Sequence, residues 1–307
     1  MPVTGLPEPP PAGRTMLPGC YDGRCVFITG GGTGLGLAMA LEFARAGASI
    51  AIASRKAEHR AAGLAALEAA GCRAATAVAL DVRDADAVRR AFDAVEAALG
   101  PVDVLVNNAA GNFPVRAEAV SPRGWQAVID IVLTGSFLCA REFARRRVAA
   151  GAEGAVLNIL ATYIDRGAPG HAHSAAAKAG VANLTRTLAV EWAPDGIRVN
   201  AIAPGLFPHA DHAPAMRERR PEGYDAEWNR IPALRVGRVR ELGWAATYLC
   251  SPYAAYVTGH VFTIDGGDRL NRSIRSPVFV PVREQLPDPD QPARPQDAAI
   301  PGHVIRS

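Results

Sequence analysis

The sequence predicts an α/β fold in which a doubly wound parallel sheet is covered by helices on both faces, within a single domain. Short, nearly continuous apolar runs alternate along the 307 residues with segments of helical periodicity. Uninterrupted apolar runs are typical of strands buried on both faces, as the strands of parallel sheets are. A glycine cluster stands between the first run and the first helical segment, at the end of the strand where such sheets bind ligands.

The expected elements follow one another in a regular order. Strands are expected over residues 25–28, 48–53, 74–80, 102–107, 155–160, 197–202 and 261–264. Helices are expected over residues 37–46, 57–70, 85–99, 121–149, 175–192 and 241–250. Asp84 is a suitable N-cap for the third helix, and Ser121 followed by Pro122 is a typical start for the fourth. The exposed end of that fourth helix is expected to hold Arg145, Arg146 and Arg147.

Proline content sets the two ends of the chain apart from the rest. Residues 1–20 and 271–307 together hold more than half of the 24 prolines and show little periodicity. We therefore expect a Pro-rich N-terminal arm over 1–20, the folded domain over 21–270 and an irregular C-terminal tail over 271–307.

The composition excludes several classes of protein. A formal net charge of +3 is too small to indicate nucleic-acid binding. The five cysteines form no C-x-x-C pair and are odd in number, which indicates reduced thiols and a cytoplasmic location. Neither a signal peptide nor an apolar segment long enough for a bilayer is recognisable, so no membrane association is expected. The histidines lack the spacing of metal ligands, so we expect no metal.

The glycine-rich loop after the first strand is the expected binding site for a cofactor pyrophosphate. Glycines let the backbone turn sharply and approach a ligand, and the following helix N-terminus attracts anions. A purely structural turn is the alternative, but the flanking strand and helix favour dinucleotide binding. The residues assigned to this contact are Gly30, Gly31, Gly32, Thr33, Gly34, Leu35 and Gly36.

The end of the second strand indicates which nucleotide is bound. An acidic residue there would accept from the ribose 2′-hydroxyl of NAD, but this chain has Ser54, Arg55 and Lys56. Two cations and a hydroxyl suit a 2′-phosphate, so NADPH is predicted, although a solvated basic helix start is the alternative. Asp81, followed by Val82, ends the third strand and is placed to meet the adenine. Arg83 could reach a phosphate or the substrate.

Further motifs accompany the glycine loop over residues 21–269. They are Asn-Asn-Ala-Ala-Gly at 107–111, Ile-Arg-Val-Asn at 197–200, Ala-Pro-Gly at 203–205, Val-Thr-Gly at 257–259 and Asp-Gly-Gly at 265–267. This combination resembles the short-chain dehydrogenase/reductase family, which implies a single-domain Rossmann fold. The resemblance also assigns to the cofactor Asn108, Ala109, Lys178, Pro204, Gly205, Leu206 and Phe207.

The chain departs from this family at its usual Tyr-x-x-x-Lys, because Ser174 stands four residues before Lys178. A serine hydroxyl is too weakly acidic to replace that tyrosine in ordinary carbonyl reduction. Another tyrosine, Tyr163, lies 15 residues before the lysine, just beyond the fifth expected strand. Lys178 is one of only two lysines in the chain, the other being Lys56.

With the runs 53–56 and 109–113, these three residues are similar to the 2,4-dienoyl-CoA reductase branch of the family. The resemblance implies that Tyr163 hydrogen-bonds the thioester oxygen, Lys178 holds the nicotinamide ribose and Ser174 supports cofactor and substrate. Hydride addition to the conjugated thioester leaves an enolate, whose oxygen needs a hydrogen-bond donor. Thr134 stands near the place where relatives carry an asparagine or aspartate, and it can donate one further hydrogen bond.

The same resemblance implies an acyl-CoA substrate, a homotetramer and a lid over residues 206–231. Arg83, Asn112 and Phe113 are assigned to the substrate. The arginines of the lid either meet the phosphates of CoA or belong to a solvated charged helix.

Two alternative functions remain open at this point. Residues 180–185 and 231–233 are also similar to the trans-2-enoyl-CoA reductases, which reduce a single conjugated double bond. A non-catalytic NADPH-binding protein is the other alternative, in which Tyr163 is an ordinary loop aromatic.

Overall fold

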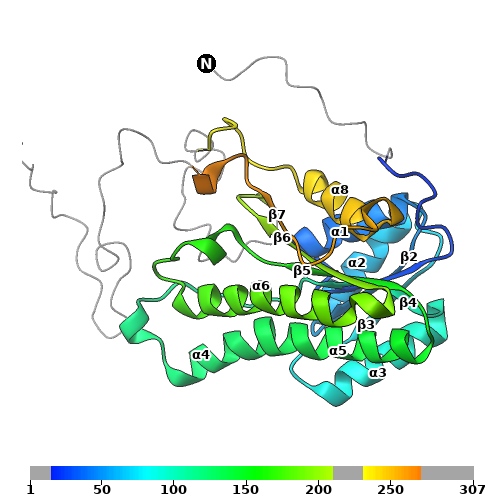
Figure 1. Cartoon of the computed structure of the whole chain (residues 1–307), viewed down its shortest axis with the longest axis horizontal. Coiled ribbons are helices and arrows are strands. Elements are labelled where there is room, and N and C mark those ends of the chain that lie inside the picture. Colours follow the sequence, from blue (N-terminus) through cyan, green and yellow to red (C-terminus); the bar gives the residue numbers. More distant parts are fainter. Residues whose placement is uncertain (1–14, 210–230, 271–307) are drawn as a thin grey trace, which may run out of the picture.

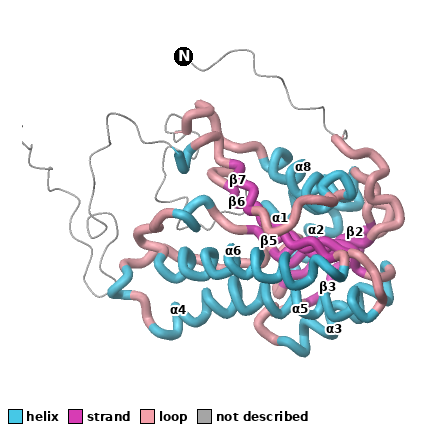
Figure 2. The backbone as a smooth tube through the Cα atoms, in the orientation of Figure 1, coloured by secondary structure: helices cyan, strands magenta, loops and turns pink. Residues whose placement is uncertain are grey.

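The computed structural model describes residues 15–209 and 231–270, which form a three-layered α/β structure around one sheet (Figure 1, Figure 2). Its seven strands are all parallel and lie in the order β3-β2-β1-β4-β5-β6-β7. They are β1 Cys25–Thr29, β2 Ser49–Ser54, β3 Ala75–Ala79, β4 Val102–Asn107, β5 Gly154–Ile159, β6 Ile197–Pro204 and β7 Val261–Ile264. The predicted doubly wound parallel sheet is therefore confirmed.

Helices cover both faces of this sheet, as the sequence predicts (Figure 1). On one face pack α1 (Gly34–Arg45), α2 (Ala57–Ala69) and α8 (Val239–Cys250). On the other face lie α3 (Ala85–Leu99), α4 (Pro122–Ile129), α5 (Gly135–Ala149) and α6 (Ala172–Trp192). Most of the predicted arm, most of the predicted lid and the whole predicted tail lie outside the described residues.

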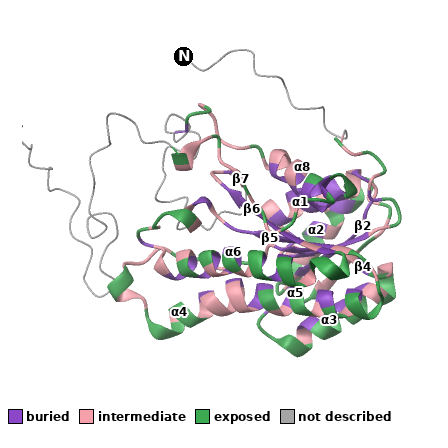
Figure 3. Cartoon of the chain, viewed as in Figure 1, coloured by how far each residue is buried: buried purple, intermediate pink, exposed green. Residues whose placement is uncertain are grey.

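Alternate strand residues supply the two main cores of the molecule, and the inner strands β1, β2, β4, β5 and β6 are mostly buried (Figure 3). Val26 and Ile28 face the core shared with α1 and α8. Cys25 and Phe27 face the core shared with α3 and α5. A chain that buries both faces of a strand cannot alternate apolar and polar residues, which explains the continuous apolar runs.

The single helix expected over 121–149 is wrong, because a turn of π-helix over Asp130–Thr134 separates α4 from α5. The start was anticipated correctly, since Ser121 Oγ accepts from Gly124 N at 3.0 Å and Pro122 is the first helical residue. At the other end of the π turn, Gly135 N donates to Asp130 O five residues earlier. Gly135 also packs so closely on Val82 that an added Cβ would lie 2.5 Å from its side chain.

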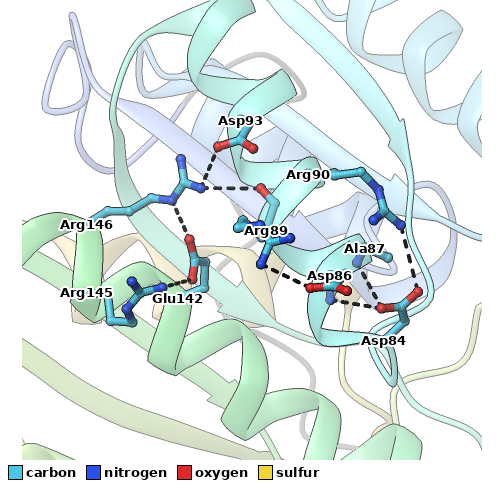
Figure 4. Close-up of polar contacts among 9 residues, drawn as sticks. All are labelled: Asp84, Asp86, Ala87, Arg89, Arg90, Asp93, Glu142, Arg145 and Arg146. Atoms are coloured by element: carbon cyan, nitrogen blue, oxygen red, sulfur yellow. Dashed lines mark hydrogen bonds and ion pairs between the residues drawn. The ribbon is translucent and has the colours of Figure 1, made fainter.

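The expectation that Arg145–Arg147 form an exposed helix end is also wrong for two of the three residues. Arg146 reaches from α5 to α3, where its guanidinium meets Asp93 at 2.7 Å (Figure 4). It also meets Glu96 at 2.6 Å. Arg147 is buried and donates to Glu153 O at 2.8 Å. Only Arg145 is largely exposed. Asp93, Glu96 and Glu153 lie outside α5. The sequence of the helix alone could therefore not predict that Arg146 and Arg147 are withdrawn from solvent.

Asp84 caps α3 as predicted, and its carboxylate accepts from Asp86 N at 2.9 Å and Ala87 N at 3.0 Å (Figure 4). None of the helices in the described part of the chain has the length and apolar character needed to cross a bilayer. Within those same residues, His, Cys, Asp and Glu side chains form no group of three that could hold a metal ion.

Candidate active site

The glycine-rich turn between β1 and α1 is tightly packed against the end of β4. Gly30 and Gly34 have φ values of 64° and 53°, which favour glycine, and a Cβ at Gly36 would lie 2.3 Å from Gly30 O. Asn108 Nδ2 donates to Thr29 O and Gly30 O, both at 3.1 Å. The carboxyl ends of β1 and β4 are thereby joined in a turn that leaves no room for larger residues.

An open cavity of about 390 Å³ lies beside this turn, at the carboxyl ends of β1 to β4. Residues from all four strand ends line it, as expected for a dinucleotide site in such a sheet. The lining contains the predicted residues Gly30, Thr33, Gly34, Leu35, Gly36, Ser54, Arg55, Lys56, Asp81, Val82, Asn108 and Ala109. These residues fit a bound dinucleotide, because they combine close backbone, the start of α1 and two cations.

Gly31 and Gly32 do not line the cavity, and both have packing roles instead. A Cβ at Gly31 would lie 2.8 Å from the side chain of Ile52, and one at Gly32 would lie 2.3 Å from His59 O. The two glycines thus let β2 and α2 pack against the turn.

The basic end of β2 is held in place by a residue that the sequence analysis missed. Arg60 Nη1 donates to Ser54 O at 2.8 Å and to Arg55 O at 3.0 Å. Ser54 Oγ accepts from Lys56 N at 3.3 Å, which tightens the same turn. Arg60 lies on α2, six residues after Ser54. Predicting its contacts requires the course of the backbone through the turn, which residue types alone do not give.

Asp81 and Arg83 form an ion pair just beyond β3, where Asp81 lines the cavity. Arg83 Nε lies 2.9 Å from Asp81 Oδ1, and Arg83 Nη2 lies 2.5 Å from Asp81 Oδ2. This side-chain hydrogen bonding holds the pKa of Asp81 below its ordinary value, with a smaller contribution from the charge of Arg55. In this structure Arg83 is therefore engaged with Asp81, whereas the sequence analysis assigned it to the substrate.

Tyr163 and Ser174 meet although they come from different elements. Tyr163 lies in a 3₁₀ turn, Thr162–Asp165, beyond the end of β5, and Ser174 lies in the first turn of α6. Tyr163 Oη and Ser174 Oγ are 2.8 Å apart, within hydrogen-bond distance. Burial raises the pKa of Tyr163, against the opposite effect of the Ser174 hydrogen bond, so the phenol keeps its proton. The pair therefore offers a neutral hydrogen-bond donor.

Lys178 lies one turn further along α6 than Ser174 and is buried. Its ammonium donates to Ile159 O at the end of β5. Removal from water lowers the pKa of Lys178 to about 8 from an ordinary value of 10.5. The described residues give it no carboxylate partner, so its charge is available for an external ligand.

A buried polar chain behind Lys178 was not anticipated from the sequence. Asn107 Nδ2 donates to Asn158 Oδ1 at 2.9 Å, and Asn158 Nδ2 donates to Thr185 Oγ1 at 2.9 Å. These contacts join β4, β5 and α6, the elements that end near the site. Asn107 and Asn158 are polar residues within apolar strands, which indicates that they have buried partners. The sequence does not identify those partners, because they lie at least 27 residues away.

The remaining predicted residues on this side of the sheet are only partly brought together. The rings of Phe113 and His173 pack edge to face, with centroids 4.4 Å apart. Asn112 is exposed beside Phe113. Thr134 is half-buried at the end of the π turn, and no hydrogen bond joins its side chain to Tyr163 or Ser174 in the described structure.

The run from Pro204 to Phe207 does not line the cofactor cavity. Gly205 N donates to Ile264 O at 2.8 Å, and buried Phe207 packs on Gly237. His209, two residues further on, lines the cavity instead, with its ring 3.1 Å from the place of a Cβ on Gly34. His209 thus joins the cavity from a segment that the sequence analysis had treated as part of the lid.

Comparison with known proteins agrees with this architecture. A family model described as enoyl-(acyl carrier protein) reductase matches residues 30–268. The chain is 40% identical to a probable 2,4-dienoyl-CoA reductase of Bacillus subtilis, with 81% of this chain and 97% of that protein covered. It is also 38% identical to galactitol 2-dehydrogenase of Cereibacter sphaeroides, with 80% and 95% covered.

A solved structure shows the same fold with a nucleotide in place. The gluconate 5-dehydrogenase of Burkholderia cenocepacia, in complex with NADP and tartrate, superimposes with a TM-score of 0.74 at 34% identity. The match covers 82% of this chain and 97% of that structure. The relatives thus share the nucleotide-binding architecture but act on different classes of substrate.

Proposed function

The chain belongs to the short-chain dehydrogenase/reductase family of NAD(P)-dependent oxidoreductases, and from this premise we propose that it reduces a conjugated C=C bond of an acyl-CoA thioester with NADPH. The substrate class is that of a 2,4-dienoyl-CoA. One observation carries the proposal, namely the 2.8 Å contact between Tyr163 Oη and Ser174 Oγ, with Ser174 one helical turn before buried Lys178. This contact supports a role for the Tyr163 phenol in a chain that has Ser174 where the family usually has its tyrosine.

The chemistry of this arrangement fits enolate formation better than ketone reduction. When bound, NADPH supplies a hydride to the conjugated system, and negative charge develops on the thioester oxygen. Tyr163 donates a hydrogen bond to that oxygen, and Ser174 Oγ supports the phenol from behind. The proton that completes the product goes to carbon and comes from water, so Tyr163 does not need to give up its own proton.

The contacts available to the cofactor support NADPH over NADH. Ser54, Arg55 and Lys56 lie at the cavity with Arg60 holding their turn, and the nearby Asp81 is already paired with Arg83. A 2′-phosphate would find two cations there. Lys178 would hold the nicotinamide ribose through its ammonium.

The direct test is to follow NADPH absorbance with a 2,4-dienoyl-CoA as substrate, for the wild type and for Tyr163→Phe. The phenylalanine variant removes one donor to the oxyanion, so kcat is expected to fall by about 10²–10³-fold with NADPH affinity unchanged. Tyr253→Phe is the matched control, because Tyr253 is exposed at 73% and remote from the cavity. Full activity of Tyr163→Phe would reject the proposed role.

The cofactor assignment has its own test, in which Arg55→Ala is compared with Arg73→Ala. Loss of one phosphate-binding cation is expected to weaken NADPH by about 10–100-fold and NADH little. Arg73 is an exposed arginine that pairs with Asp22 and does not line the cavity, so its replacement should affect neither nucleotide. Equal losses for NADPH and NADH would contradict the 2′-phosphate assignment.

The same screen decides between the alternatives that the sequence left open. Turnover of a trans-2-enoyl-CoA but not of a dienoyl-CoA would favour the enoyl-CoA reductases, and NADPH binding without turnover would favour a non-catalytic protein. Turnover of ketones or sugar alcohols would reject Tyr163 as the oxyanion donor. The homotetramer and the cytoplasmic location stay predictions.

A further inference from the structure

His173 lies next to Ser174 in the first turn of α6 and is fully buried. Its Nδ1 accepts a hydrogen bond from Ser174 N at 2.8 Å. Amide groups in the first turn of a helix have no partner within the helix, so another group must accept from them. The imidazole therefore completes the start of α6 at the residue whose hydroxyl meets Tyr163.

This contact fixes the protonation state of the ring. A nitrogen that accepts cannot carry a proton, so the neutral tautomer with its proton on Nε2 is assigned from the hydrogen bond. Nε2 is buried and has no hydrogen-bond partner among the described residues. The ring of Phe113 packs against the imidazole at 4.4 Å, edge to face.

Protonation of His173 would break this arrangement. An N–H on Nδ1 would face the N–H of Ser174, so an acceptor would become a second donor. The positive end of the α6 dipole also disfavours a cation in the first turn. Consistent with this, burial and the charge of His171 lower the pKa of His173, although a contact with the His171 backbone acts in the opposite direction.

We propose that neutral His173 is a positioning residue, which holds Ser174 where its Oγ meets Tyr163 Oη and releases that pair when it is protonated. This inference rests on the proposed function in one respect, because the kinetic test measures the proposed reaction. His173 acts through Ser174 and has no direct contact with the reacting atoms. Activity should therefore depend on its protonation in a way that cofactor binding does not.

Three titratable or charged groups lie near the start of α6 in the described structure. His171 is on the same turn of α6, and Tyr163 reaches Ser174 from the 3₁₀ turn. Arg116 follows Val115, whose N–H donates to Gly170 O at the start of α6. Burial raises the pKa of Tyr163, so its phenol keeps its proton throughout mildly acidic pH. The charge of His171 lowers the pKa of His173, and this contribution can be removed separately.

The test compares the pH dependence of kcat in wild type, His173→Asn and His173→Leu. Asparagine places an oxygen where Nδ1 stands but does not titrate, whereas leucine removes the acceptor. In the wild type, kcat should fall on the acid side of the ordinary histidine value of 6.5, because the pKa of His173 is lowered by burial. His173→Asn should keep kcat within about threefold at neutral pH and lose this acid limb. His173→Leu should lose about tenfold at every pH, with the KM for NADPH unchanged.

His171→Gln is the matched control for a neighbouring histidine. It should keep the acid limb and move it to slightly higher pH, because the charge of His171 no longer opposes protonation of His173. An acid limb that persists in His173→Asn, or wild-type kinetics in His173→Leu, would overturn the proposal. Thermal unfolding of each variant identifies any that fails to fold.

A second readout separates this proposal from the proposed function. Nitrogen NMR of the imidazole in the full-length protein should show the Nε2–H tautomer, and the Tyr163 ring signals should shift as His173 titrates. Both can be measured without any acyl-CoA. If dienoyl-CoA is not turned over but these signals behave as expected, only the proposed function fails. An Nδ1–H tautomer, or Tyr163 signals that ignore the titration, overturns the positioning role directly.

Discussion

Two cations, Arg146 and Lys178, are both withdrawn from water, and their surroundings differ in almost every respect. Arg146 lies between α5 and α3, and its guanidinium bonds Glu142 and Asp93 (Figure 4) as well as Glu96. Lys178 is buried at the end of β5 and bonds one backbone oxygen. Burial opposes the charge in both residues. For Arg146 the carboxylates outweigh this effect and raise its pKa, whereas the pKa of Lys178 falls to about 8.

The comparison separates a charge that serves the fold from a charge that serves a ligand. Arg146 has its counter-ions within the chain, so its electrostatic interactions are complete before anything binds. Lys178 lacks a carboxylate within the described structure and remains available for an anionic or hydroxyl-bearing ligand. Perturbed and unpaired groups of this kind concentrate at functional sites.

The largest effect should come from Lys178→Met, which removes the unpaired charge. The expected loss in kcat/KM is about 10²–10³-fold, because the variant lacks the cation that we propose holds the nicotinamide ribose. Stability should change little or rise, since about 3 kcal/mol of relieved desolvation offsets about 1–3 kcal/mol for the orphaned Ile159 carbonyl. Steady-state kinetics and denaturant unfolding measure the two quantities. A loss of stability above about 3 kcal/mol would assign Lys178 a structural role.

The opposite pattern is expected for Arg146→Met. The variant leaves Asp93, Glu96 and Glu142 without their shared cation, so the free energy of unfolding should fall by about 1–3 kcal/mol. Activity at a temperature where the variant is folded should match the wild type. Urea unfolding and the same kinetic assay check this pair of outcomes. A selective loss of kcat with unchanged stability would contradict the division between the two cations.

The pH dependence of cofactor binding sharpens the comparison further. Above about pH 8 Lys178 loses its proton in the free protein, so NADPH affinity should fall by up to about tenfold per pH unit. Lys178→Met should show no such dependence. Because the folded pKa lies below the unfolded value of 10.5, the wild type should also gain stability relative to this variant between pH 8 and 10.5. Fluorescence titration and unfolding curves across this range measure both effects.

The smallest effect is expected for Arg60→Leu, because the Arg60 guanidinium bonds backbone oxygens of the chain. Arg60 holds Ser54 O and Arg55 O, so its loss should loosen the turn and weaken NADPH by about fivefold. NADH affinity should stay within twofold of wild type. Arg90→Leu is a suitable control, because Arg90 is exposed on α3 and pairs with Asp84 (Figure 4). A loss as large as that of Arg55→Ala would place Arg60 in direct contact with the phosphate.

Features governed by neighbouring residues were predictable from the sequence. Asp84 and Ser121 cap their helices as expected, because an N-cap depends on amides two or three residues away. The seven strands were also predictable, because each one is a nearly continuous apolar run in the sequence. The π turn at Asp130–Thr134 was missed, since it accompanies the close approach of Gly135 to Val82, 53 residues earlier.

The residues of the candidate site also divide into those that local sequence predicted and those that it did not. The glycine turn and the basic end of β2 are continuous in sequence, and most of their predicted residues line one cavity. Contacts between distant segments, such as His209 over Gly34 or the chain from Asn107 to Asn158, depend on how the elements pack. Tyr163 and Ser174 are separated by ten residues, yet their proximity was implied only by a family resemblance.

The hydroxyl groups of Tyr163 and Ser174 can each donate to the other. In the proposed reaction, negative charge grows on a thioester oxygen, and the phenolic hydrogen can turn toward it while the serine hydrogen turns toward the phenol. This exchange of direction moves two light atoms and leaves every heavy atom in place. Only the two hydroxyl groups need to rotate when the charge distribution changes, and the α/β framework can stay as it is.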